Sequence, residues 1–376
     1  MPRLSIFLLT VFLISSCVDV FEFDLPDTEQ NKLIVNGAIT SLPGPQEIRV
    51  FRSQGFGESD TQPFAVRDAI VYVTDDLGDR RNFTFAFDDL QSSFCVDLVR
   101  DLGPTNLDLA QNFRYVSSSG FQGQVGRTYT LHVELSDGTK VVSSPQLLEA
   151  SIPVGEVTAT YVVDETLSES GTEIPDDKWI VEATLDQSGE SSEDNYLTWR
   201  HRGTFRISTN PELYCDYNDC SAPGVCVPAC CDECWVVEYG QSLTNTSAAT
   251  LESLSENRLT VATIPIIAMR TESIYHLDLF QYRIASDVYD FYEALNGQLT
   301  NQGSIFDPPP YSEESNLTYE DGRDEPILGY FWVAGAAHEV LTISPTTVTR
   351  QYNYFFPNDC QRVPGASTEK PEYYQN

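Results

Sequence analysis

Basic residues are scarce in this sequence of 376 residues, where 22 lysines and arginines stand against 56 aspartates and glutamates, for a formal net charge of −34. A chain this acidic repels phosphate backbones and anionic membrane surfaces, both of which attract basic proteins. We therefore expect no nucleic-acid partner. The charge is compatible with attraction of cations, and more simply with a solubilising surface.

The sequence also lacks the short motifs of several enzyme classes. It contains no Gly-x-Ser-x-Gly elbow, no phosphate-binding glycine loop and no dinucleotide fingerprint. His338-Glu339 begins like a zinc-protease helix but has no second histidine four residues after the first. The acidic run at residues 75–79 departs from the EF-hand pattern and predicts a hairpin turn rather than a calcium site. We expect a protein that is not an enzyme and has no cofactor and no resident metal.

No hydrophobic run of membrane-spanning length follows the first 17 residues, since a spanning helix needs about 20 apolar residues. Residues 4–14 form a shorter apolar run after a basic start, which fits a secretory signal. The sequence Ile14-Ser15-Ser16-Cys17 resembles a bacterial lipobox. That resemblance implies cleavage before Cys17 and acyl chains on this cysteine. The alternative is an ordinary cleaved signal with a free cysteine.

Short segments with alternating apolar residues and turn residues between them fill the rest of the chain. In residues 129–135, Tyr129, Leu131, Val133 and Leu135 share one face of a strand, and Asp-Gly follows as a turn. Such strands at short spacing predict a mainly β protein with two β-sandwich-like (Ig-like) domains. The predicted parts are a signal peptide at 1–16, an acylated tether at 17–32, an N-terminal sandwich at 33–150 and a C-terminal β-rich domain at 151–376.

One segment of the C-terminal domain has a helical rather than a strand pattern. Val288, Phe291, Tyr292 and Leu295 recur at spacings of three and four residues. This pattern predicts an amphipathic helix over residues 287–300, with Ser286 or Asp287 able to cap it.

Cysteines are concentrated in one loop, residues 215–234, and an exported chain is expected to oxidise them to disulfides. The spacing of Cys231 and Cys234 is also that of a zinc pair. We favour disulfides over metal or redox chemistry, because zinc pairs are usually separated by a longer loop. The connectivity stays open. The disulfide candidates are Cys95, Cys215, Cys220, Cys226, Cys230, Cys231, Cys234 and Cys360.

Several stretches of the second half resemble a known family. They are Gly303-Ser304-Ile305-Phe306-Asp307-Pro308-Pro309-Pro310, Ile327-Leu328-Gly329-Tyr330-Phe331 and Cys234-Trp235-Val236. Together they resemble a Bacteroidota outer-membrane lipoprotein family that is classed as a domain of unknown function and is often encoded beside TonB-dependent transporters. The resemblance implies a location and a partner but no ligand.

Proline fixes φ and stiffens the chain, so the segment after the helix forms a rigid strap. The strap either packs on the sheet, which we favour, or presents an edge to a partner or ligand. The candidate contacts are Phe306, Pro308, Pro309, Pro310 and Tyr311.

These observations predict a lipid-anchored outer-membrane protein, exposed at the cell surface. We expect it to be an accessory subunit of a TonB-dependent transporter that helps nutrient capture or gating, by analogy with the starch-utilisation solute-binding lipoproteins. A surface hydrolase of glycans or peptides with paired carboxylates is one alternative. An adhesin-like structural module is another.

Overall fold

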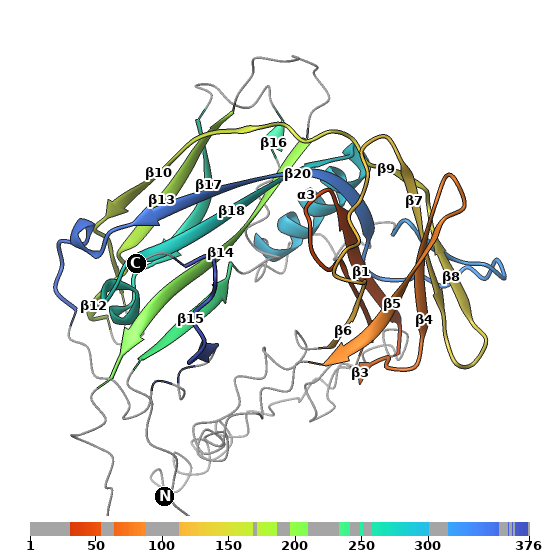
Figure 1. The fold of residues 1–376 in the computed structure, drawn as a ribbon, viewed down its shortest axis with the longest axis horizontal. Helices are drawn as coiled ribbons and strands as arrows, with labels where there is room; N and C mark the ends of the chain where they lie inside the picture. Colours follow the sequence, from red (N-terminus) through yellow and green to blue (C-terminus); the bar gives the residue numbers. More distant parts are fainter. Residues whose placement is uncertain are drawn as a thin grey trace, which may run out of the picture.

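The computed structural model of the protein describes residues 31–53, 64–87, 113–167, 171–185, 196–209, 233–240, 249–250, 258–300, 315–352, 360, 363 and 365–374. These residues are mainly in β-strands, and two β modules lie side by side (Figure 1). The predicted fold class, mainly β, is confirmed.

The first module contains the strands of the N-terminal part of the chain. They are β1 (Leu33–Thr40), β2 (Glu47–Arg52), β3 (Phe64–Ala65), β4 (Ile70–Asp75), β5 (Arg80–Phe87), β6 (Phe113–Val116), β7 (Thr128–Glu134), β8 (Lys140–Ser143) and β9 (Gln146–Leu147). Their alternating apolar residues turn inward, as in β7, where Tyr129, Leu131 and Val133 are buried. The acidic run between β4 and β5 forms the predicted hairpin turn, with Gly78 at φ 84° and Asp75 accepting the backbone N–H of Asp79 at 2.9 Å.

The second module contains most of the later strands. They are β10 (Val154–Val162), β11 (Glu165–Leu167), β12 (Glu173–Pro175), β13 (Lys178–Leu185), β14 (Tyr196–Ser208), β15 (Glu233–Tyr239), β16 (Ala249–Thr250), β17 (Arg258–Pro265), β18 (Tyr275–Ile284) and β21 (Ala366–Ser367). Two 3-10 turns, η7 (Ala268–Thr271) and η8 (Pro345–Thr347), lie at its end. The sheet β10-β13-β17 packs on β14, β15 and β18 around a core that includes Trp179, Trp199 and Tyr275.

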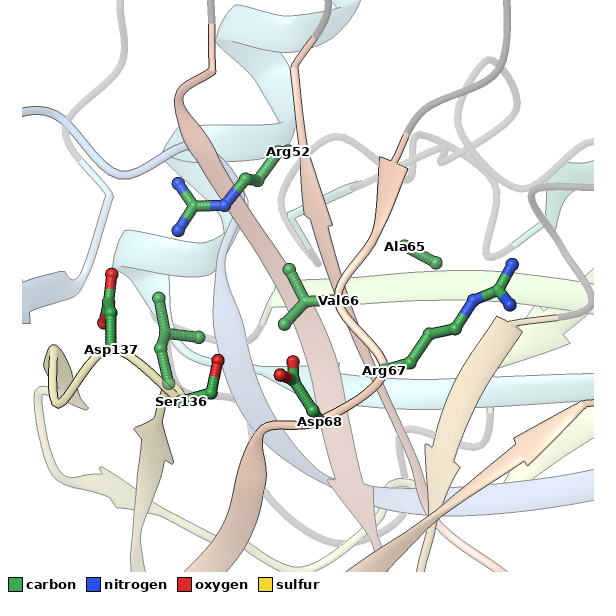
Figure 2. A pocket seen from close by; sticks show the side chains of 8 residues that line it. Arg52, Ala65, Val66, Arg67, Asp68, Ser136 and Asp137 are labelled. Atoms are coloured by element: carbon green, nitrogen blue, oxygen red, sulfur yellow. The ribbon is translucent and has the colours of Figure 1, made fainter.

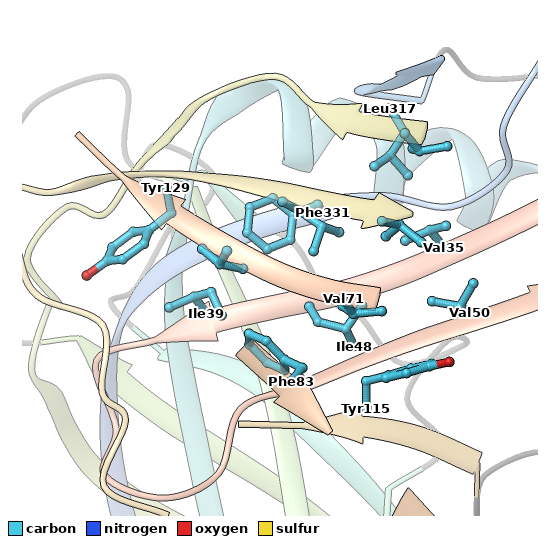
Figure 3. Packing of buried hydrophobic residues seen from close by; sticks show 14 of the residues in the cluster. Val35, Ile39, Ile48, Val50, Val71, Phe83, Tyr115, Tyr129, Leu317 and Phe331 are labelled. Carbon is cyan, nitrogen blue, oxygen red and sulfur yellow. The ribbon is translucent and has the colours of Figure 1, made fainter. Parts of the chain in front are cut away.

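Strands β19 (Leu317–Tyr319) and β20 (Phe331–Ile343) return from the C-terminal half to the first module. Strand β19 pairs with β8, and β20 runs parallel to β1 through residues 331–334. Leu317, Phe331 and Val333 therefore pack with Val35 and Ile48 in the first core (Figure 3). The predicted division of the chain at residue 150 stays a prediction, but the first core also needs residues from beyond it.

The second part of β20 continues into the other module. Residues 335–343 pair antiparallel with β18, so a single sheet of 16 strands runs through both modules. Gly335 stands where β20 changes partner, and a Cβ there would lie 2.2 Å from the carbonyl oxygen of Glu149. The close approach of two backbones requires glycine at this position.

The only α-helix in the described part of the chain is α3 (Ser286–Thr300), which confirms the helix predicted for residues 287–300. It packs on the face of β18 and β20 that is opposite the second core. Val288 and Tyr292 contact that face beside Tyr282 and Trp332. Asp287 fixes the start of the helix by accepting the hydroxyl of Tyr330 at 2.7 Å.

Candidate functional site

Most of the site residues predicted from the sequence lie outside the residues that the structure describes. These are Cys17, Cys95, Cys215, Cys220, Cys226, Cys230, Cys231, Phe306, Pro308, Pro309, Pro310 and Tyr311. Two of the predicted disulfide candidates, Cys234 and Cys360, are described.

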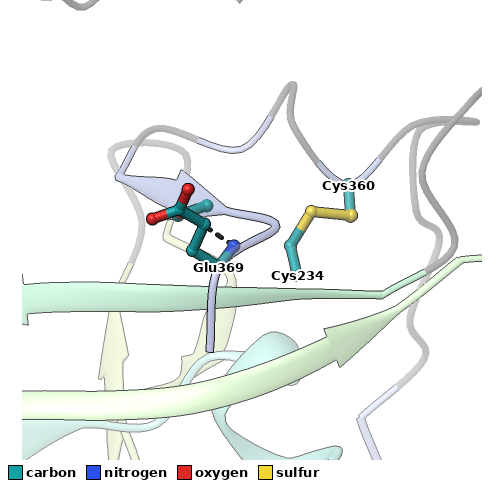
Figure 4. Close-up of a disulfide and its surroundings, with 4 residues drawn as sticks. Cys234, Cys360 and Glu369 are labelled. Carbon is teal, nitrogen blue, oxygen red and sulfur yellow. Dashed lines mark hydrogen bonds between the residues drawn. A yellow bond between two sulfur atoms is a disulfide. The ribbon is translucent and has the colours of Figure 1, made fainter. Parts of the chain in front are cut away.

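Cys234 and Cys360 form a disulfide with their Cα atoms 5.7 Å apart (Figure 4). Cys234 is the second residue of β15, and both cysteines are fully buried in the second core. The bond joins positions 126 residues apart. By the loop-closure relation, a cross-link of this span stabilises the folded state by about 4–5 kcal/mol. Strand β15 is thus covalently attached to the C-terminal part of the chain at Cys360.

A cavity of about 340 Å³ lies at one end of the first module, lined by Arg52, Arg67, Asp68 and Asp137 among others. In Figure 2, Arg52, Asp68 and Asp137 surround the hollow, while the guanidinium of Arg67 points away from Asp137. The backbone N–H of Thr139 donates to Asp137 at 2.8 Å, and this bond lowers the pKa of Asp137. A carboxyl that acts as a general acid needs a raised pKa. The cavity is a polar recess. The lowered pKa of Asp137 does not suit this carboxyl to act as a general acid.

A richer group of side chains lies on the outer face, which we define as the face of β14, β18 and β20 opposite the second core. Residues two apart along a strand share a face, so Arg200 and Arg202 of β14 both project there. The register places Arg200 beside Phe280 of β18, and Phe280 beside His338 of β20. This row crosses three neighbouring strands.

Asp278 is the centre of a hydrogen-bonded network on the outer face. Its carboxylate is buried and accepts two bonds from Arg202, from Nε at 2.9 Å and Nη2 at 2.7 Å. Its other oxygen lies 2.8 Å from Nε2 of His338. A buried carboxylate is costly unless it is paired in this way. The His338 ring also stacks on Phe280, with centroids 4.7 Å apart, so its orientation is fixed twice.

Arg200 is exposed and rests on aromatic rings. Its guanidinium carbon lies 5.4 Å from the ring centre of Trp332 and 6.0 Å from that of Tyr282. Within the described ranges, no carboxylate forms an ion pair with Arg200. Arg202, in contrast, forms an ion pair with Asp278, and its guanidinium carbon lies 4.1 Å from the ring centre of Tyr373.

The arrangement is better suited to binding than to nucleophilic catalysis. A carboxylate that orients a histidine is half of a catalytic triad. Among the described residues, however, no serine, threonine or cysteine side chain is hydrogen-bonded to His338. No group of three or more potential metal ligands occurs in the same part of the chain. A face with arginine, histidine and aromatic rings can bind anionic groups through charge-assisted hydrogen bonds.

The alternation of residue types along β14 and β18 indicates this face, although it matches no catalytic or metal-binding motif. Arg200 and Arg202 alternate with Trp199 and His201, and β18 alternates His276, Asp278 and Phe280 with the core residues Tyr275, Leu277 and Leu279. On each of these two strands, one face therefore carries polar and aromatic side chains. Which strands lie side by side was not evident, because β18 and β20 are separated by a helix and a long connection.

A family model described as "Domain of unknown function (DUF4249)" matches residues 18–339. The chain belongs to the DUF4249 family. Membership in a family classed as a domain of unknown function, which the sequence predicted, is confirmed. The DUF4249 match includes Arg200, Asp278 and His338, while Cys360 and Tyr373 lie beyond it. No curated protein matches this member of the DUF4249 family.

Proposed function

We propose that this protein is an exported lipoprotein, held at the outer membrane by acyl chains on Cys17, and an accessory subunit of a TonB-dependent transporter. In this role it captures a nutrient or gates its entry by binding, without chemistry. The protein would be displayed at the cell surface, with the two β modules over or beside the transporter pore.

The Cys234–Cys360 disulfide is the observation that carries the export part of the proposal. Disulfides persist in oxidising compartments and are rare where thiol reductants act. Both sulfurs are buried in the second core, which protects the bond from exchange. An oxidising location agrees with the signal-like start of the sequence and with its lipobox-like residues 14–17.

The anchoring part rests on the lipobox-like residues 14–17, which end at Cys17. No helix in the described ranges is long and apolar enough to cross a membrane. Acyl chains contribute about 0.8 kcal/mol per buried methylene group, and more than one chain gives a stable anchor. The transporter partnership rests on the family resemblance at Gly303–Pro310 and residues 327–331.

Co-purification tests this proposal. The full-length protein carries a C-terminal tag, is extracted in a mild non-ionic detergent, and its partners are identified by mass spectrometry. We expect a TonB-dependent transporter at a stoichiometric level, and a diacylated or triacylated peptide that begins at Cys17. The matched control is Cys17→Ser, which should leave the membrane fraction and lose the transporter.

An unrelated tagged outer-membrane lipoprotein controls for bulk co-extraction. Recovery of the tagged protein without a transporter contradicts the partnership. An unmodified Cys17 contradicts the anchor and leaves the partnership to be judged by co-purification alone.

A further inference from the structure

The polar recess of the first module lies where the chain crosses between two pairs of strands. Strand β3 pairs with β2, whereas β4, which follows it, pairs with β7. Residues 66–69 make this crossing. The cavity of about 340 Å³ lies beside it, between Arg52 at the end of β2 and residues 135–137 after β7. Small-molecule sites typically occupy about 300–1,000 Å³, so the recess has the volume for a compact ligand.

Hydrogen bonds hold the wall of the recess in place. The hydroxyl of the buried Tyr115 donates to the carbonyl of Val66 at 2.9 Å and accepts the backbone N–H of Ala69 at 3.0 Å. The N–H of Val66 donates to the carbonyl of Val50 at 3.0 Å. Both ends of the crossing are thus fixed to neighbouring strands without a ligand. A wall that is already ordered lowers the entropic cost of binding.

Charges of both signs surround the hollow and are not paired with one another. Figure 2 shows Arg52 on one side of it, with Asp68 and Asp137 on other sides. Nη1 of Arg52 donates to the carbonyl of Asn31 at 3.3 Å, which is a long bond to a neutral group. Neither Arg52 nor Asp68 forms an ion pair with a residue that the structure describes. Both charges are therefore available to a ligand.

Asp137 is held in position by the turn after β7. Its carboxylate accepts the backbone N–H of Thr139 at 2.8 Å. The bonds from Thr139 lower the pKa of Asp137, and the positive charges of Arg52 and Arg323 lower it further. An ionised carboxylate therefore stands at this side of the recess at neutral pH.

This arrangement favours a ligand that carries charges of both signs. A simple anion is attracted by Arg52 and repelled by the two aspartates, and a simple cation meets the reverse. A ligand with separate carboxylate and ammonium groups satisfies all three side chains, and such complementarity gives specificity. Val66 and Leu135 add an apolar part to the lining, on which a hydrocarbon side chain can pack.

A second recess, of about 400 Å³, borders the same Asp137-Gly138 turn and provides a contrast. Its arginine, Arg323, is already paired, with Nε 2.9 Å from an oxygen of Asp321. Arg52 has no such carboxylate partner within the described ranges. The unpaired charges therefore point to the first recess, rather than the second, as a binding site.

We propose that the recess between Arg52, Asp68 and Asp137 binds a zwitterionic ligand of the size of an amino acid or a dipeptide. The carboxylate of the ligand pairs with Arg52, its ammonium group pairs with Asp68 and Asp137, and its side chain lies on Val66 and Leu135. The inference goes beyond the proposed function, because the recess binds this ligand with or without a transporter.

Calorimetric titration of the full-length protein in a non-ionic detergent tests the recess. The probes are leucine and alanyl-leucine, each also in an N-acetylated form, which lacks the ammonium group, and in an amidated form, which lacks the carboxylate. We expect at least one free zwitterion to bind, and the tighter of the two shows the length of the ligand. Its two blocked forms should each bind about 10-fold or more weakly, the usual effect of losing one charged hydrogen bond.

Two variants assign each charge of the ligand to its partner. Arg52→Gln should weaken the free zwitterion about 10-fold or more, but should not weaken the amidated form, which has no carboxylate to pair. Asp68→Asn should weaken the free zwitterion and should not weaken the acetylated form, which has no ammonium group. A variant that had lost its fold would weaken every probe, so this pattern separates a lost contact from a lost structure.

The matched control is Arg81→Gln, which removes the same charge from an exposed arginine of β5 outside the lining of the recess. It should change the affinity less than about twofold, because exposed charges at a distance are screened. The proposal is overturned if neither zwitterion binds, if a blocked form binds as tightly as the free one, or if Arg81→Gln weakens binding as much as Arg52→Gln. Co-purification with a transporter is measured separately, so the two proposals fail independently.

Discussion

At the scale of single residues, we expect a substitution of Asp278 to lower the stability of the protein strongly. Asp278→Asn keeps the shape but removes the charge that Arg202 and His338 share. Removing one partner of a buried ion pair typically costs about 3–5 kcal/mol, and the partial exposure of Arg202 sets the expected loss near the lower end, at about 3 kcal/mol. Urea denaturation measures it.

The control for this change is Asp79→Asn, which breaks the exposed pair with Arg81. Its expected effect is less than about 1 kcal/mol. Equal urea midpoints for the two variants would show that Asp278 is solvated. They would contradict the hydrogen-bonded network described for the outer face.

Two histidines outside the candidate site should make stability depend on pH. Burial lowers the pKa of His132 and of His201 below the ordinary value of 6.5. The unfolded chain then binds more protons than the folded chain between the lowered value and 6.5, so stability rises with pH across this window. The contribution of these two histidines to stability is complete above pH 6.5 and is lost as the pH falls below this value.

The measurement is the urea midpoint between about pH 7 and about pH 5, a range above the ordinary pKa of carboxyl groups. The wild type should lose stability on acidification. The double variant His132→Gln with His201→Gln should lose less over the same range. A wild-type midpoint that does not change would contradict the assigned burial of both rings.

At the scale of elements, strand identity followed from the sequence and strand partnership did not. The alternation of apolar residues at 129–135 predicted β7, which the structure places at Thr128–Glu134, and the three-and-four spacing predicted α3. Alternation reports which side chains are buried, and it contains no information about which strand lies next to which. The parallel pairing of β1 with β20 joins residues almost 300 positions apart, and no local signal encodes it.

The candidate site could be predicted only in its parts, for the same reason. Arg200 lies on β14 and His338 on β20, and their row depends on β18 standing between these two strands. The disulfide is similar, since the even set of exported cysteines predicted bonds but could not select Cys234 with Cys360.

Gly335 tests the element that connects the modules. Gly335→Ala places a methyl group 2.2 Å from the carbonyl oxygen of Glu149 and 2.4 Å from the backbone nitrogen of Ser151. Both are backbone atoms, so β20 or the segment beside it must shift, at an expected cost of about 2–3 kcal/mol. The control is Gly120→Ala, where nothing lies within 4 Å of the new methyl group. Thermal denaturation should separate the two variants, and a Gly335→Ala protein as stable as Gly120→Ala would contradict the close approach.

At the scale of the whole molecule, β20 makes the two modules one structure. Phe331 and Val333 are buried in the first core, and Ile343 of the same strand is buried in the second. Neither core can lose this strand and remain complete. In addition, Gln281 of β18 donates to the carbonyl of Ile152 at 2.7 Å, which fixes the linker between the modules to the sheet.

We therefore expect the modules to unfold together. Hydrogen exchange under increasing urea should give the slowest amides of β7, in the first module, and of β14, in the second, the same free energy of opening. Gly335→Ala should lower both by the same amount, because it acts on the strand that they share. If instead the amides of β7 exchanged through an opening that left β14 protected, the modules would be independent domains.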